Sequence, residues 1–105
     1  MNWHVHYTKS AEQDLQGIFD YISNVLLEPA IAEKQTERIM DAADSLEHMP
    51  LRHRLCDYEP WRSEGWRVMP VDNYLVFYFP DKSKDIVAIS RIMYAGRDIE
   101  KHLSK

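Results

Sequence analysis

The sequence predicts an α+β protein with a short first strand, an antiparallel helical hairpin, a three-strand antiparallel meander and a short C-terminal helix or tail. Three observations predict this order. Residues 3–7 alternate between apolar and polar side chains, residues 11–46 repeat apolar side chains every three or four positions, and residues 66–94 return to strand-like runs between turn residues. With 105 residues, 45% of them hydrophobic and 29% charged, the chain is expected to form one globular domain, residues 1–105.

The expected first strand has an apolar face formed by Trp3, Val5 and Tyr7. His4 and His6 lie on its other face. Two histidines at this spacing can bind a metal ion, but the sequence offers no third ligand beside them. We therefore expect a solvated or hydrogen-bonded pair and no metal site.

Two amphipathic helices follow. In the first, apolar side chains recur at Ala11, Leu15, Ile18, Ile22 and Val25. Ser10 and Gln13 have the spacing of a capping box at its start. Pro29 ends this helix and begins the second, which runs to about Met49 and is stopped by Pro50. The second apolar stripe is Ala32, Ile39, Ala42 or Ala43, and Leu46, with acidic residues on its flanks. Helices joined by so short a link fold back into a hairpin.

Residues 51–64 show no sustained period and are expected to form a loop. The loop contains His53, Cys56, Asp57 and Glu59, residue types that act as nucleophiles and bases in other proteins. Their spacing sets no geometry among them. We assign no catalysis here, and Glu59 is the best candidate base.

Three short strands form the expected meander. They cover residues 66–71, 74–79 and 85–94, with turns at residues 72–73 and 81–84. Pro70 has no amide hydrogen to donate, so the first of these strands belongs at a sheet edge or carries a bulge. Residues 97–103 follow as a helical turn or a tail.

The second and third strands of the meander are apolar on both faces. Tyr74, Val76 and Tyr78 alternate with Leu75, Phe77 and Phe79, and Ile86, Ala88 and Ile92 alternate with Val87, Ile89 and Met93. A two-helix hairpin covers only one face of such a sheet. We expect the other face to be exposed and to bind a protein partner.

The formal net charge of −4 is unevenly distributed, because residues 1–50 carry three Lys or Arg against nine acids and residues 51–105 carry ten against eight. This predicts an acidic helical half and a mildly basic half that holds any site for an anionic partner. Cys56 is the only cysteine, which excludes an intramolecular disulfide and suits a reducing cytoplasm. No apolar run approaches the roughly 20 residues of a membrane span. We expect a cytoplasmic protein without membrane contact.

In their order and spacing, these elements resemble the RelE/ParE superfamily of toxins from bacterial type II toxin–antitoxin systems, over nearly the whole chain. The matching motifs are Ala11, Asp14-Leu15, Ile18, Tyr21-Ile22, Trp66-Arg67, residues 73–78 (Asn-Tyr-Leu-Val-Phe-Tyr) and residues 91–98 (Arg-Ile-Met-Tyr-Ala-Gly-Arg-Asp). The resemblance implies a growth-inhibiting toxin of the plasmid stabilisation type, without a cofactor, neutralised by a cognate antitoxin. It also implies a complex that represses its own promoter through the antitoxin. The antitoxin is expected to contact Trp66, Tyr74, Val76 and Tyr78.

Two mechanisms divide this superfamily. Members that cut messenger RNA on the ribosome require a base, an acid and a cationic clamp on the phosphate. They resemble one another in placing these groups on the second strand, within the Tyr-x-x-x-Tyr strand and at the end of the last strand. Arg67 and Tyr94 match two of the places. Leu75, Met69 and Met93 occupy the others, so the ribonuclease constellation is incomplete.

The ParE branch acts on DNA gyrase and needs no such constellation. Residues 91–98 are nearer to this branch, so we favour action on gyrase, with Arg67, Arg91 and Arg97 binding the target. Cleavage of ribosome-bound messenger RNA, with Arg67, Arg91 and Tyr94 as catalytic residues, is the alternative. An inactive module that only holds its antitoxin is a second alternative.

Overall fold

A four-stranded sheet of order β1-β4-β3-β2 forms the centre of the computed structural model, which describes residues 2–103. β1 (His4–Tyr7) pairs in parallel with β4 (Ile86–Tyr94). β3 (Tyr74–Asp81) lies between β4 and β2 (Arg67–Val71) and is antiparallel to both, which confirms the predicted meander. β2 is an edge strand, as the missing amide hydrogen of Pro70 requires.

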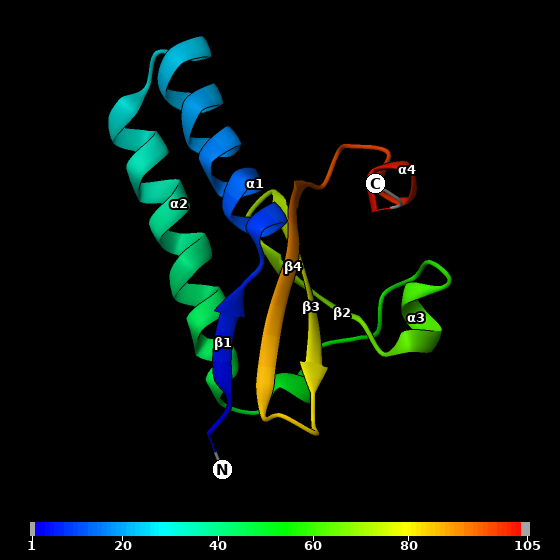
Figure 1. Cartoon of the computed structure of the whole chain (residues 1–105). Helices are drawn as coiled ribbons and strands as arrows, with labels where there is room; N and C mark the ends of the chain where they lie inside the picture. The colour runs from blue at the N-terminus through cyan, green and yellow to red at the C-terminus, as the bar shows by residue number, and fades with distance from the viewer. Residues whose placement is uncertain (1, 104–105) are drawn as a thin grey trace.

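The predicted helical hairpin is present and covers one face of the sheet (Figure 1). It consists of α1 (Lys9–Asp20), which continues as a π-helical turn over Tyr21–Val25, and α2 (Pro29–Asp44). Pro29 stands at the start of α2, where its missing amide hydrogen breaks no helical hydrogen bond. α2 ends earlier than predicted, in a 3-10 turn at Ser45–Glu47.

The predicted capping box at the start of α1 is wrong. The cap is Thr8, whose side-chain oxygen accepts a hydrogen bond from the amide of Ala11 at 3.2 Å. Ser10 already lies inside the first turn of the helix. Thr8 also donates to the carbonyl of Ile89 on β4, so the cap joins the start of α1 to the sheet.

The core between hairpin and sheet contains most of the predicted helical stripes. Its buried residues are Ala11, Ile39, Ala43 and Leu46 from the helical part, and Met69, Val71, Val76, Tyr78, Val87, Ile89 and Ile92 from the sheet. Val25 is the exception, with 64% of its surface exposed. The π-helical turn changes the helical period after Ile22, so Val25 does not continue the apolar stripe of the first helix.

The second face of the sheet is covered by the chain itself, so the predicted exposed face is wrong. Residues 51–64, expected to be a loop, contain a 3-10 turn (Pro50–Arg52) and α3 (Trp61–Glu64), and α4 (Ile99–Leu103) follows the sheet. α3 and α4 lie on the side opposite the hairpin (Figure 1). The core on this side consists of Cys56, Val68, Phe77, Met93, Ile99 and Leu103, with Tyr58, Trp61, Trp66 and Leu75 packed against it.

A β-bulge in β4 also changes the predicted alternation of that strand. Phe77 pairs with Arg91 while the next residue, Tyr78, pairs with Ile89, so Ser90 has no partner on β3. The extra residue brings Ile92 into the helix-side core with Val87 and Ile89. The sequence pattern had placed Ile92 on the opposite face from those two residues.

None of the helices within residues 2–103 is both long and apolar enough to cross a lipid bilayer.

Candidate functional site

A groove of about 690 Å³ lies between α1 and the adjoining ends of β3 and β4. From the hairpin it is lined by Gln13, Asp14, Gly17, Ile18, Tyr21, Ile22 and Leu26, and from the sheet side by Tyr74, Ile92, Met93, Tyr94 and Arg97. Its volume lies within the range of about 300–1,000 Å³ typical of ligand sites. The lining is mostly apolar, with few charged groups.

Two tyrosines from neighbouring strands form the sheet side of the groove. Tyr74 and Tyr94 are paired across β3 and β4, with ring centroids 5.9 Å apart at an interplanar angle of 70°. Such edge-to-face contacts fix both rings. Burial raises the pKa of Tyr74 above its usual value, whereas Tyr94 is 52% exposed. Tyr94 is therefore the accessible aromatic side chain of the pair.

The hairpin side of the groove continues into an exposed apolar tip. Tyr21 and Leu26 line the groove and are 54% and 51% exposed. Val25 and Leu27 extend this surface beyond the groove and are also exposed. A contiguous apolar surface on a small protein is typical of an interaction site.

Arg91 is held inside the molecule. Its Nε and Nη2 donate to the Asp14 carboxylate at 2.8 and 3.1 Å, and its Nη1 donates to the carbonyl of His102 on α4 at 2.9 Å. The side chains of Arg91 and Asp14 are only 17% and 16% exposed. Asp14 also accepts the amide of Ile92, next to the bulge. Arg91 thus joins α1, β4 and α4, with its predicted catalytic and target-binding roles left untested.

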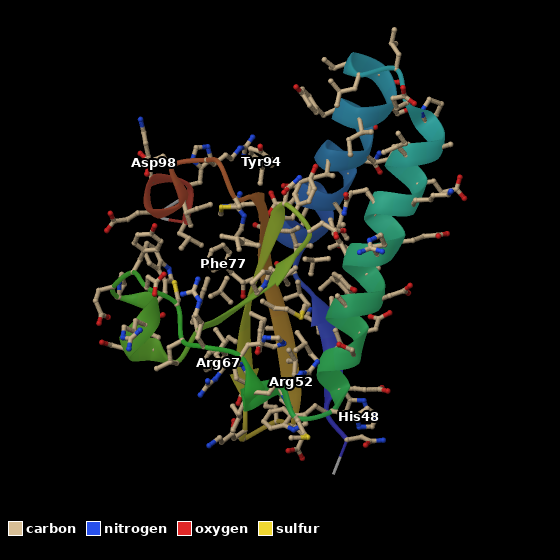
Figure 2. The ribbon with its side chains drawn as sticks, turned by 180° about the vertical axis from the view of Figure 1, so that it is seen from behind. His48, Arg52, Arg67, Phe77, Tyr94 and Asp98 are labelled. Atoms are coloured by element: carbon tan, nitrogen blue, oxygen red, sulfur yellow. The ribbon has the colours of Figure 1, made fainter. Side chains whose placement is uncertain are left out.

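Arg67 lies about half-way along the sheet from the groove. It pairs with Tyr78 on β3, whereas Tyr94 pairs with Tyr74. Four residues of strand, roughly 13 Å at about 3.3 Å per residue, separate those two positions. Figure 2 shows Arg67 and Tyr94 well separated along the length of the sheet. The structure does not bring Arg67 and Tyr94 together.

The guanidinium of Arg67 is engaged within the protein. Its Nη1 donates to the carbonyl of His53 at 2.6 Å, and its Nε is buried without a hydrogen-bond partner among the described residues. Arg97, by contrast, is exposed and lines the groove. Its backbone amide donates to the carbonyl of Tyr94 at 3.1 Å. Of the residues predicted for target binding or catalysis, Tyr94 and Arg97 meet at the groove.

The four residues predicted to bind the antitoxin differ in position. Tyr74 lines the groove, and Trp66 is half-buried against the second core. Val76 and Tyr78 are fully buried beneath the hairpin. The hydroxyl of Tyr78 donates to the carbonyl of Pro50. A protein partner cannot reach Val76 or Tyr78 in this conformation. Strand alternation places both side chains on the same face of β3 as Tyr74, and at Val76 and Tyr78 the hairpin covers that face.

The polar residues of segment 51–64 do not converge. Burial raises the pKa of the Cys56 thiol, which disfavours the reactive thiolate. Hydrogen bonds from Ser63 lower the pKa of Glu59, and Asp57 forms an ion pair with Arg54 at 2.7 Å. A carboxylate with a lowered pKa is a poor base near neutral pH.

The sequence did not predict that residues of the hairpin line the groove. Tyr21 and Leu26 fall outside the regular apolar stripe of the first helix, and an apolar residue off the stripe is the signal that finds them.

Comparison with known proteins agrees with this fold. The sequence profile of a family described as the ParE toxin of the type II toxin–antitoxin system parDE matches residues 5–99. The chain is similar in structure to the chromosomal ParDE system from P. aeruginosa, with a TM-score of 0.71 and 23% identity, covering 88% of this chain and 95% of that chain. A search of curated proteins returns no significant match.

Two further solved structures share the fold. One is the toxin–antitoxin complex RelBE2 from Mycobacterium tuberculosis, with a TM-score of 0.64 and 21% identity, covering 90% of this chain and 99% of that chain. The other is the archaeal RelE–RelB complex from Pyrococcus horikoshii OT3, with a TM-score of 0.62 and 15% identity, covering 92% and 99%. The predicted resemblance to the RelE/ParE superfamily is confirmed, and with the family match over residues 5–99 the chain belongs to the ParE toxins of type II toxin–antitoxin systems.

Proposed function

We propose that this toxin inhibits growth by acting on DNA gyrase, and that a cognate antitoxin silences it by binding in the groove between α1 and β4. The observation that carries the choice of target is the separation of Arg67 from Tyr94 along β3. Cleavage of RNA by its own 2′-hydroxyl requires a base, an acid and a cation around one phosphate. Groups roughly 13 Å apart along a strand do not surround one phosphate.

The other positions of the ribonuclease constellation support the same choice. Met69 and Met93 are buried, and Leu75 packs against the second core. Arg91 is neutralised by Asp14. A phosphate clamp would have to be assembled from Tyr94 and Arg97 alone. Removing one preorganised donor costs on the order of 10² to 10³ in rate, so a site lacking several is ineffective.

The groove supports the proposed binding of an antitoxin. It joins an apolar floor to exposed apolar residues of the hairpin tip, Tyr21, Leu26 and Leu27. An amphipathic segment of an antitoxin would cover both surfaces, as a helix laid in a hydrophobic groove does. The related structures from M. tuberculosis and P. horikoshii are toxin–antitoxin complexes, which supports an antitoxin as the occupant.

The target is tested by adding a molar excess of purified toxin to gyrase in a plasmid supercoiling reaction. We expect supercoiling to be inhibited and restored by the antitoxin. Arg97→Gln should weaken inhibition, whereas Arg54→Gln, which changes an exposed arginine outside the groove, serves as the matched control. Toxin that arrests growth yet leaves supercoiling unchanged contradicts the proposal.

The same preparation is incubated with translating ribosomes, and the ends of the messenger are mapped. Cuts at defined codon positions would establish ribonuclease activity in place of action on gyrase. Normal growth of cells at verified expression, in the absence of antitoxin, would identify an inactive antitoxin-binding module.

A further inference from the structure

A second groove, of about 410 Å³, runs along the other side of α1. α1 contributes Glu12, Leu15, Gln16 and Phe19, and α2 contributes Thr36 and Met40. None of these residues lines the first groove. Their spacing of three and four residues places them on one side of α1, with the first-groove residues on the other. The two grooves are therefore separate surfaces, and both can be occupied at once.

The floor of this outer groove is apolar, and the hydroxyl groups beside it already have hydrogen-bond partners. Leu15 and Phe19 are half-buried, and Met40 is 38% exposed. The Thr36 hydroxyl donates to the carbonyl of Ala32 at 3.0 Å. At one end of the groove the Tyr7 hydroxyl donates to the Asp44 carboxylate at 3.1 Å. Apolar side chains entering the groove would leave no buried polar group without a partner.

Carboxylates predominate around this floor, although the exposed Lys9 lies three residues before Glu12 on α1. Glu12 lines the groove itself. On α2, Glu33, Glu37 and Asp44 are exposed and lie three or four residues from Thr36 or Met40, on the same side of the helix. Arg38, the only arginine of α2, forms a bidentate ion pair with Asp72. The first fifty residues hold three basic side chains against nine acids, so the field over this face is negative.

We propose that the outer groove binds a cationic amphipathic helix of a protein partner. The apolar side chains of that helix would pack on Leu15, Phe19 and Met40, and its lysines or arginines would lie against the acidic rim. A helix is the occupant because a third helix packs readily into the furrow between two antiparallel ones. The negative rim selects positive flanks and accelerates encounter. This surface lies outside the groove proposed for the antitoxin and does not depend on the cellular target.

The probe is a synthetic helical peptide of Leu and Lys with all leucines on one face. About 16 residues match the 16 residues of α2, or roughly 24 Å of helix. One control peptide replaces each Lys by Glu, and another keeps the composition but scrambles the order. Binding to the isotope-labelled full chain is followed by nuclear magnetic resonance, which locates the contact and gives Kd.

We expect shift changes centred on Leu15, Phe19 and Met40, and weakening as salt rises. Met40→Lys should raise Kd about tenfold or more, and the double variant Glu33→Gln with Glu37→Gln about threefold to tenfold, because a rim charge contributes modestly. Glu100→Gln on α4 and Tyr94→Ala in the first groove should leave Kd unchanged. Circular dichroism verifies that each variant is folded.

Three results with the peptides would overturn the proposal. These are equal binding of the glutamate or scrambled peptide, shift changes centred on the first groove, and no binding of the Leu and Lys peptide up to about 1 mM, the weak end of specific association. A loss of affinity in Glu100→Gln equal to that of the rim variants would indicate diffuse charge attraction and would also overturn it.

Discussion

A β-carbon on Gly96 would lie 2.5 Å from Cε2 of Tyr94, closer than real atoms approach. The ring of Tyr94 therefore rests directly against the backbone at residue 96, with Tyr74 on another side at a centroid distance of 5.9 Å. The exposed tyrosine of the groove is held in place by the absence of a side chain at Gly96 together with an aromatic neighbour.

Gly96→Ala is expected to displace the Tyr94 ring and weaken antitoxin binding. Losing the edge-to-face contact costs about 0.5–1.5 kcal/mol, which corresponds to an increase in Kd of roughly twofold to tenfold. Isothermal titration calorimetry with the cognate antitoxin measures the change. Unaltered affinity in a folded Gly96→Ala protein would show that the antitoxin does not use Tyr94.

Gly17→Ala is expected to stabilise the protein. Gly17 lies inside α1 with nothing within 4 Å of the position of an added β-carbon. Alanine removes backbone freedom from the unfolded chain without a clash, so the free energy of unfolding should rise by about 0.5–1 kcal/mol. Urea unfolding monitored by tryptophan fluorescence provides the measurement. A loss of stability would mean that the methyl group meets a neighbour.

Asp14→Asn should destabilise the protein far more than the matched change Asp72→Asn. Asp14 neutralises the largely buried Arg91, and we expect a cost of about 2–3 kcal/mol when that charge is left uncompensated. The Arg38–Asp72 pair is exposed, with side-chain exposures of 66% and 32%, so water screens it and its loss should have a much smaller effect. Equal losses in urea unfolding would contradict the structural role of Arg91.

Tyr78→Phe should remove part of the loss of stability at alkaline pH. Burial raises the pKa of Tyr78 to about 12, whereas an unfolded tyrosine titrates near about 10. Between these values the unfolded chain releases a proton that the folded chain retains, so stability is full below pH 10 and falls as the pH rises towards 12.

The variant should be less stable at pH 7 by about 1–2 kcal/mol, because the carbonyl of Pro50 loses its donor. Its further decline between pH 10 and 12 should be shallower than that of the natural protein. Tyr7, whose pKa is also raised by burial, contributes equally to both proteins. Parallel pH profiles in urea unfolding would refute the assignment.

Arg67→Gln is expected to retain growth arrest while lowering stability. Its contact with the His53 carbonyl holds segment 51–64 against β2, and losing it should cost about 0.5–1.5 kcal/mol. Growth of induced cells, with toxin quantified by immunoblot, is compared with thermal unfolding of the purified variant. Loss of arrest in a folded protein would restore Arg67 as a functional residue.

Much of the fold follows from local chemistry that the sequence displays. Pro29 begins a helix and Pro70 belongs to an edge strand because neither can donate an amide hydrogen. The turns around Asp72 and between β3 and β4 follow from their polar residues. The bulge at Ser90 carries no such signal, since its unpaired position depends on the neighbouring strand.

The candidate site was less predictable for a related physical reason. Alternation shows that a strand has two apolar faces, but it does not show which segment covers each face. Val76 and Tyr78 were assigned to a partner, whereas α1 and α2 bury them, and α3 and α4 bury the face that was expected to be open. Tyr21 reaches the groove at regular helical spacing from Gly17 and Ile18, and Leu26 follows the π-helical turn.

The parallel pairing of β1 with β4 sets the order in which the molecule can be completed. His4 pairs with Ile86 and Tyr7 with Ile89, so β1 waits for residues made more than eighty positions later. Until then one edge of the incipient sheet has no neighbour, and the groove beside β4 does not exist. A nascent chain therefore acquires this groove only after residues 86–94 have been made, so no partner can bind there on a shorter chain.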